Sequence, residues 1–154
     1  MPLWTITSPT ATYSADDRAA IAAGITKLYT DGPRLPAFYV TVLFHELDPS
    51  TFFVGGEARG DVVRIAVDHI ARRFDDAAEH LGVDADLDLR RAWLDGVIRA
   101  LTPFTGDRGL HWELHADETP SSLWAIDGLA PPPPWSAEEA RWKREGRASP
   151  TPTS

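Results

Sequence analysis

Residues 2–7, PLWTIT, and residues 62–70, VVRIAVDHI, decide the fold, because each is a strand pattern that begins a β-α-β unit. Both stretches are apolar and rich in β-branched residues, which favour extended backbone. A helix pattern follows each of them, and another strand pattern follows each helix. Since a helical crossover joins strands that can pair in parallel, we predict two such units in succession.

The first unit has clear boundaries. Ser14 and Asp17 resemble a capping box, which predicts the start of the helix. Apolar residues then recur at helical spacing until DGP at residues 31–33 ends the helix. Residues 37–47, AFYVTVLFHEL, predict the second strand, with alternate side chains on opposite faces.

A hairpin with a glycine pair at residues 55–56 leads into the second unit. Residues 110–117, LHWELHAD, predict its last strand. The helix before that strand ends at Pro103, and its apolar face consists of Leu87, Leu94, Val97, Ile98 and Leu101. We therefore predict an α+β domain over residues 2–130, divided into units of about 2–60 and 61–130.

The end of the chain has a different composition. Residues 131–146 form an arm that begins with four prolines, which predict extended polyproline II backbone. Ser136 and Glu139 are spaced to cap a short helix in this arm, which also carries two tryptophans. We expect the arm to pack on its own body or on a neighbouring subunit, and residues 147–154 to be disordered.

The bulk composition excludes several classes of function. The 154 residues carry a net charge of −8, which disfavours nucleic acid or an anionic membrane as a partner. The absence of cysteine excludes disulfides, thiolate zinc sites and cysteine nucleophiles. The sequence shows neither a signal-peptide pattern nor an apolar run of membrane length, so we expect a cytoplasmic protein.

Pro2 is the first residue with a chemical consequence. Removal of Met1 would expose a secondary amine on a rigid ring, and a free α-amino group titrates near ~8. Desolvation or nearby cations would leave much of this amine neutral and able to accept a proton. Because an apolar strand begins here, the amine would be fixed within the fold. The alternative is an ordinary proline in second position.

Arginines form the second candidate group. Arg72 and Arg73 follow the third predicted strand, and Arg64 lies within it. Guanidinium groups near an amine disfavour its protonated form, and they bind carboxylates through two parallel hydrogen bonds. The alternative is that these arginines are solvated charges of a loop.

Metal binding is a third possibility. His111, Glu113 and His115 alternate along the last strand and share one face, a spacing that zinc or iron would accept. The alternative is a polar sheet face with hydrogen-bonded histidines. Because the sequence has no further ligand motif such as HExxH, we favour the polar face and predict no metal.

Five stretches together resemble a known family: MPLWTI, LPAFYVTVLF, TFFVGGE, RIAVDHIAR and WELHADETPSSLW with GLAPPP after it. They are similar to the cis-3-chloroacrylic acid dehalogenase-like group of the tautomerase superfamily, in its oxalocrotonate tautomerase branch. The resemblance extends to about Arg147. It implies a homotrimer in which two fused β-α-β units of each chain form one mixed sheet packed against two helices. It also implies an amino-terminal proline as general acid or base, with no metal and no organic cofactor.

The resemblance also implies roles for particular residues. The arginines that bind the substrate carboxylate fall near Arg72 and Arg73, and His69 lies in the same region of the pocket. Three positions depart from the dehalogenase. Tyr29 stands in place of a histidine, Asp127 lies near the position of the water-activating glutamate, and Leu114 or His115 replaces a tyrosine.

We therefore predict a tautomerase for a small α-keto or enol carboxylate, in which Pro2 moves the proton and Arg72 and/or Arg73 binds the carboxylate. Tyr29, Tyr39 and His69 are candidates for orienting the substrate. One alternative is a hydratase or dehalogenase for unsaturated or halogenated short acids, with Asp127 or His115 activating water. Another is a trimeric binding protein without catalytic activity.

Overall fold

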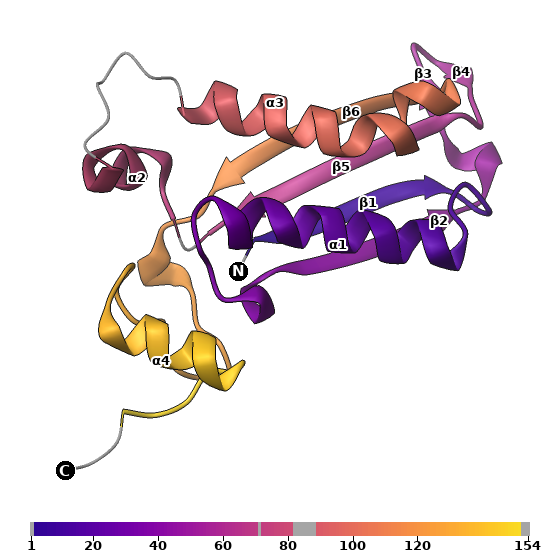
Figure 1. Ribbon diagram of the computed structural model, residues 1–154. Coiled ribbons are helices and arrows are strands. Elements are labelled where there is room, and N and C mark those ends of the chain that lie inside the picture. The colour runs from indigo at the N-terminus through magenta and orange to yellow at the C-terminus, as the bar shows by residue number, and fades with distance from the viewer. Residues whose placement is uncertain (1, 71, 82–88, 152–154) are drawn as a thin grey trace.

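Four strands form a mixed sheet, and two long helices cover one of its faces (Figure 1). The computed structural model describes residues 2–70, 72–81 and 89–151. The sheet order is β2-β1-β5-β6, and its strands are β1 (Leu3–Pro9), β2 (Thr41–Leu47), β5 (Val62–His69) and β6 (His111–Glu118). Strands β1 and β2 are parallel, as are β5 and β6, while β1 and β5 pair in the antiparallel sense. This arrangement confirms the two β-α-β units.

The two covering helices are α1 (Ala15–Asp31) and α3 (Leu89–Leu101). The predicted capping box of α1 is confirmed, because the Ser14 side chain accepts from the Asp17 amide and the Asp17 side chain accepts from the Ser14 amide. A short additional helix, α2 (Phe74–Leu81), lies between β5 and α3, where the sequence analysis placed no element. Leu87, which we placed on the apolar face of the second helix, lies outside the described residues. None of the described helices has the length and apolarity needed to cross a membrane.

The strand predicted over residues 37–47 begins later than expected. Its first part is a turn of 3₁₀ helix, η1 (Ala37–Tyr39), in which the Tyr39 amide donates to the Pro36 carbonyl. The alternating apolar pattern continues through both parts, so it could not distinguish this turn from the strand. The turn leaves Tyr39 buried in the core instead of on a strand face.

The predicted hairpin is confirmed. Its strands are β3 (Phe53–Val54) and β4 (Glu57–Ala58). Between them, Gly55 and Gly56 have φ values of 62° and 88°, which only glycine adopts without strain. The remaining short 3₁₀ turns are η2 (Pro49–Thr51), η3 (Thr102–Phe104), η4 (Gly106–Arg108) and η5 (Ser121–Leu123).

The core lies between the sheet and the two long helices. Side chains alternate along β1 and β5, and their buried members are joined by the inner residues of α1 and α3. The main contributors are Trp4, Ile6, Ile21, Ile25, Ile65, Val67 and Val97. The opposite face of the sheet is more open, and Leu43 and Leu47 of β2 are exposed there, by 44% and 46%.

The C-terminal arm packs on its own chain. Its helix is α4 (Ala137–Glu145), and Ser136 caps it by accepting from the Glu139 amide, as expected. Trp142 is 2% exposed and lies with its ring 6.4 Å from that of Tyr39. We expected residues 147–154 to be disordered, but Ser149 is buried and its carbonyl accepts from the Trp142 indole at 2.8 Å. The described part of this tail therefore belongs to the packed arm.

Replacing Trp142 by Ala should lower the free energy of unfolding by about 3–5 kcal/mol, because a large buried side chain would leave a cavity. Urea unfolding followed by circular dichroism measures this change. Leu123→Ala is the control: Leu123 is 77% exposed, and its truncation should change stability by less than about 0.5 kcal/mol. Equal effects of the two substitutions would show that the arm is not docked.

Candidate active site

Pro2 is buried at the end of the sheet where β1 begins. Its carbonyl accepts from the Thr41 amide at 3.0 Å, which fixes it against β2. On the other side, Leu3 of β1 lies opposite Asp68 of β5, so the next position outward places Pro2 beside His69. Because side chains alternate along a strand, those of Pro2 and His69 both lie on the face that the helices cover.

Glu118 extends this row onto a third strand. The register of β5 with β6 places it opposite His69, on the same covered face. Pro2, His69 and Glu118 therefore lie side by side across three strands. Sequence analysis had identified the first two, but Glu118 becomes a neighbour only through the pairing of β5 with β6.

A chain of polar contacts runs beneath the row. The Trp4 indole Nε1 donates to the Tyr29 hydroxyl at 3.2 Å, and this hydroxyl lies 3.4 Å from His69 Nδ1. The phenol and the imidazole thus form a hydrogen-bonded pair, in which the tautomer of His69 decides which of the two donates. Burial raises the pKa of Tyr29, so the phenol stays protonated. Burial likewise lowers the pKa of His69, against the opposing charge of Glu118.

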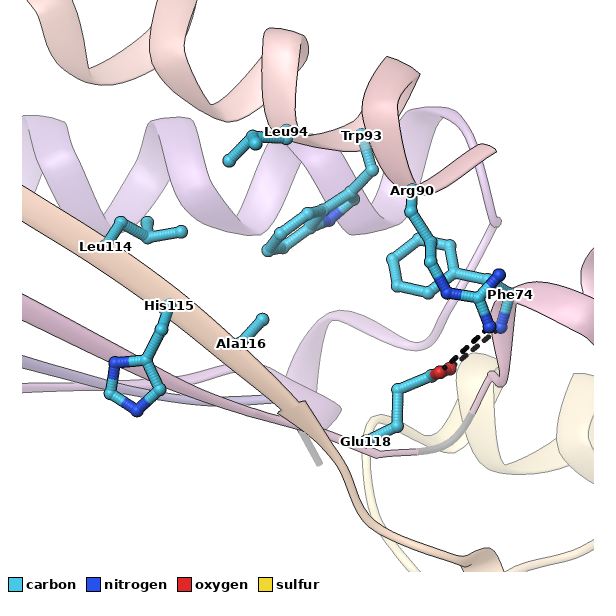
Figure 2. A pocket seen from close by; sticks show the side chains of 8 residues that line it. All are labelled: Phe74, Arg90, Trp93, Leu94, Leu114, His115, Ala116 and Glu118. Atoms are coloured by element: carbon cyan, nitrogen blue, oxygen red, sulfur yellow. Dashed lines mark hydrogen bonds and ion pairs between the residues drawn. The ribbon is translucent and has the colours of Figure 1, made fainter. Parts of the chain in front are cut away.

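Aromatic rings connect His69 to a hollow. The imidazole stacks on Phe74, with centroids 4.7 Å apart and an interplanar angle of 6°, and it meets the edge of Trp93 at 5.6 Å. The rings of Phe74 and Trp93 form one wall of a cavity of about 220 Å³ between α3 and β6 (Figure 2). Its lining residues are Phe74, Arg90, Trp93, Leu94, Leu114, His115, Ala116 and Glu118.

Charged groups stand at one end of the hollow. Figure 2 shows the Arg90 guanidinium directed at the Glu118 carboxylate, and Arg90 Nη2 lies 3.3 Å from Glu118 Oε2. The same nitrogen lies 2.9 Å from Asp75, and the other Glu118 oxygen accepts from the Phe74 amide at 3.0 Å. Sequence analysis missed Arg90 and Trp93. Their i, i+3 spacing on one helix face was a signal, but an ordinary core helix carries it too.

The three candidate arginines lie in different environments. Arg64 is on the open face of the sheet, where it approaches His115. Arg72 is buried, and its guanidinium is bound to Glu139 of the arm. Arg73 is the accessible one of the pair that follows β5: its side chain is 56% exposed, and Asp75 is 3.8 Å away.

Three candidates remain, each in a different environment: His115, Asp127 and Tyr39. The His115 ring is directed to the open face of β6, away from Trp93 (Figure 2). Asp127 is exposed in a tight turn with φ of 51°, closed by the pairing of Ile126 with Leu129. Tyr39 is buried beneath the arm, with its ring 5.1 Å from that of Trp124.

Arg64 explains how the polar face of β6 is satisfied. It lies opposite Glu113 in the β5–β6 register, with Nη1 3.3 Å from Glu113 Oε1 and Nη2 2.7 Å from His115 Nδ1. A guanidinium thus stands between two of the residues that we considered as metal ligands. Within residues 2–70, 72–81 and 89–151, no three His, Cys, Asp or Glu residues are grouped closely enough to hold a metal ion.

The duplicated β-α-β fold, with a proline at the start of its first strand, defines the class of protein, and comparison with known families agrees. Residues 1–147 match the family described as "Putative oxalocrotonate tautomerase enzyme". The chain belongs to this family and thus to the tautomerase superfamily, which the sequence resemblance had indicated. Among curated proteins, none matches the chain.

Solved structures show the same relationship. RhCC from Rhodococcus jostii RHA1 is 39% identical over 97% of this chain and 100% of its own, with a TM-score of 0.87. A probable enzyme from the thermophilic fungus Aspergillus fumigatus is 35% identical over 98% of both chains, with a TM-score of 0.85. N1, of the cis-3-chloroacrylic acid dehalogenase family, is 24% identical over 92% of this chain and 90% of its own. Its TM-score of 0.62 supports the shared fold alone.

The lowered pKa of His69 predicts a pH dependence of stability. The unfolded histidine takes up a proton below its ordinary pKa of 6.5 more readily than the folded one, so the free energy of unfolding should fall as the pH drops through that value. His69→Gln should remove this part of the slope in urea unfolding at pH 7.5 and 5.5. His111→Gln, at an exposed histidine, should keep it. An unchanged slope in His69→Gln would contradict the prediction.

Proposed function

We propose that this protein is a tautomerase in which the Pro2 amine acts as general acid and base on a small α-keto or enol carboxylate. The observation that carries the proposal is the position of Pro2, buried at the start of β1 and beside His69. Membership of the tautomerase family supports the reaction class. An isomerisation needs no cofactor here, because one amine both removes and returns the proton.

The proposed mechanism uses the surroundings of this amine. Neutral Pro2 removes a proton from the carbon beside the keto group, and the electron pair of that C–H bond forms the enolate. The protonated amine then gives the proton to the enolate oxygen. Since Glu139 binds the Arg72 guanidinium, we assign the substrate carboxylate to the exposed Arg73. Tyr29 and His69 hold the wall of the site, and Tyr39 supports it beneath the arm.

The positions of His115 and Asp127 favour a tautomerase over a hydratase or dehalogenase. Either of those reactions needs a group that activates water next to the substrate. The His115 ring faces the open side of the sheet, and Asp127 lies in an exposed turn. A binding protein without catalytic activity remains the alternative, and substitution of Pro2 tests it.

We further propose that the protein is a cytoplasmic homotrimer. A fused 4-OT that is 17% identical over 84% of this chain forms an asymmetric trimer, and its TM-score of 0.63 supports the shared fold. In this chain, Leu43 and Leu47 expose apolar surface on the sheet face opposite the helices, which another copy would cover. The cytoplasmic location follows from sequence patterns alone.

Sedimentation equilibrium should therefore give about three chain masses. Leu43→Asp should weaken the assembly, because it would place a charge in a desolvated interface. Leu123→Asp should leave it intact, since Leu123 lies beyond the sheet in η5. A monomer at micromolar concentration would contradict the proposed trimer.

Pro2→Ala tests the catalytic proposal. The variant keeps a terminal amine after Met1 is removed, but the amine is primary and less rigid. Its kcat for an enol of the phenylpyruvate type should fall by roughly 10²-fold or more, with a small change in KM, because proton transfer belongs to the transition state. Pro9→Ala, at the other end of β1, should keep the wild-type rate.

The pH–rate profile and mass spectrometry complete this test. A general base must be deprotonated, so the wild-type rate should rise with pH as the Pro2 amine loses its proton. This rise should disappear when Met1 is retained, because the nitrogen is then part of an amide. Mass spectrometry establishes whether Met1 is present in each preparation. Full activity in a folded protein that retains Met1 would exclude the amine as the catalytic group.

A further inference from the structure

Glu139 and Arg72 form a buried ion pair between the C-terminal arm and the segment that follows β5. Arg72 Nη1 lies 3.1 Å from Glu139 Oε1, and Nη2 lies 2.9 Å from Oε2, which is the two-bond geometry of a strong pair. Their side chains are only 4% and 8% exposed. Helix α4 carries Glu139 to the end of the sheet where β1 begins (Figure 1).

The surroundings of the pair make it a fixed contact. The Arg72 guanidinium lies 4.2 Å from the centre of the Trp135 ring, and its Nη2 is 3.4 Å from the Pro33 carbonyl. Glu139 Oε2 also accepts from the Trp135 amide at 2.8 Å. Both carboxylate oxygens are therefore used within the chain. Loss of the Glu139 carboxylate with the arm in place would leave a buried guanidinium without its counter-charge, which is strongly unfavourable.

The pair is adjacent to the candidate site in sequence, because Arg72 and Arg73 lie between His69 and Phe74. His69 and Phe74 stack on each other, and Phe74 lines the hollow. The Phe74 amide is held by Glu118. Arg72 is bound to the arm, whereas its neighbour Arg73 is exposed and shares Asp75 with Arg90, which lines the hollow.

We propose that Glu139 is a positioning residue that, through Arg72, presents Arg73 to the substrate carboxylate. The inference rests on the proposed function of the same site. It makes the arm a part of that site, although Glu139 is 67 residues beyond Arg72 in sequence. It also separates the roles of two adjacent arginines: Arg72 anchors the arm, and Arg73 binds the anion.

Glu139→Gln tests this role, because it removes the counter-charge while keeping the shape of the side chain. Kinetics are measured with an α-keto acid and with its methyl ester, which has no carboxylate for Arg73 to bind. We expect KM for the acid to rise about tenfold, close to the effect of Arg73→Ala, and KM for the ester to change less than about twofold. Glu138→Gln, at the preceding residue of α4, should match the wild type for both substrates.

A double variant covers the case in which Glu139→Gln fails to fold. Arg72→Met combined with Glu139→Met replaces the buried pair by apolar side chains of similar length, a change that folded proteins tolerate. It should keep the arm docked and the preference of the wild type for the acid. Loss of that preference would show that Arg72 itself binds the substrate and would overturn the proposal.

Two further outcomes would also overturn it. A lower KM for the acid in Glu139→Gln would mean that Glu139 competes with the substrate for Arg72. Equal losses for acid and ester would mean that the pair is only structural.

Binding of benzoate, which cannot tautomerise, separates this inference from the proposed function. Its dissociation constant is measured by NMR in the wild type, Glu139→Gln and Arg73→Ala. Weaker binding in both variants supports the inference even if the wild type turns over no keto acid, in which case only the proposed function fails. Turnover by the wild type with no change of benzoate affinity in Glu139→Gln would overturn the inference alone.

Discussion

The antiparallel pairing of β1 with β5 is the contact on which the rest of the structure depends. It is the junction between the two β-α-β units, and it turns two parallel strand pairs into one sheet with one covered face. The same register sets the start of β1 beside the end of β5, so that Pro2 meets His69. Core and candidate site are thus two consequences of one alignment, since a shift by one residue would turn every side chain of β1 to the other face.

The sequence predicted what local patterns determine. Alternation of apolar residues located the strands, and the capping box at Ser14 located the start of α1. The turn at Tyr39 was missed, because its apolar spacing suits a strand equally well. Glu118 and Arg90 could not be placed beside His69, since their proximity arises from strand pairing and helix packing and not from neighbouring positions in the chain.

The environments of the charged residues could not be predicted from the sequence either. Sequence reasoning treated Arg72 and Arg73 as one candidate group, but the structure gives them opposite environments. A guanidinium is buried only when a carboxylate accompanies it, and the carboxylate here comes from a helix that the sequence marked as a separate arm. The histidines of β6 are a comparable case, because Arg64 of the neighbouring strand satisfies a face that resembles a set of metal ligands.

The docked arm has a consequence for how the polypeptide is made. Synthesis proceeds from the amino terminus, so the sheet and both covering helices leave the ribosome before Glu139 and Trp142 do. Until then Arg72 has no carboxylate from α4, and Tyr39 lacks the ring that covers it in the finished molecule. The nascent chain can therefore build its sheet early, but the end of the sheet that holds Pro2 is finished only when α4 has emerged.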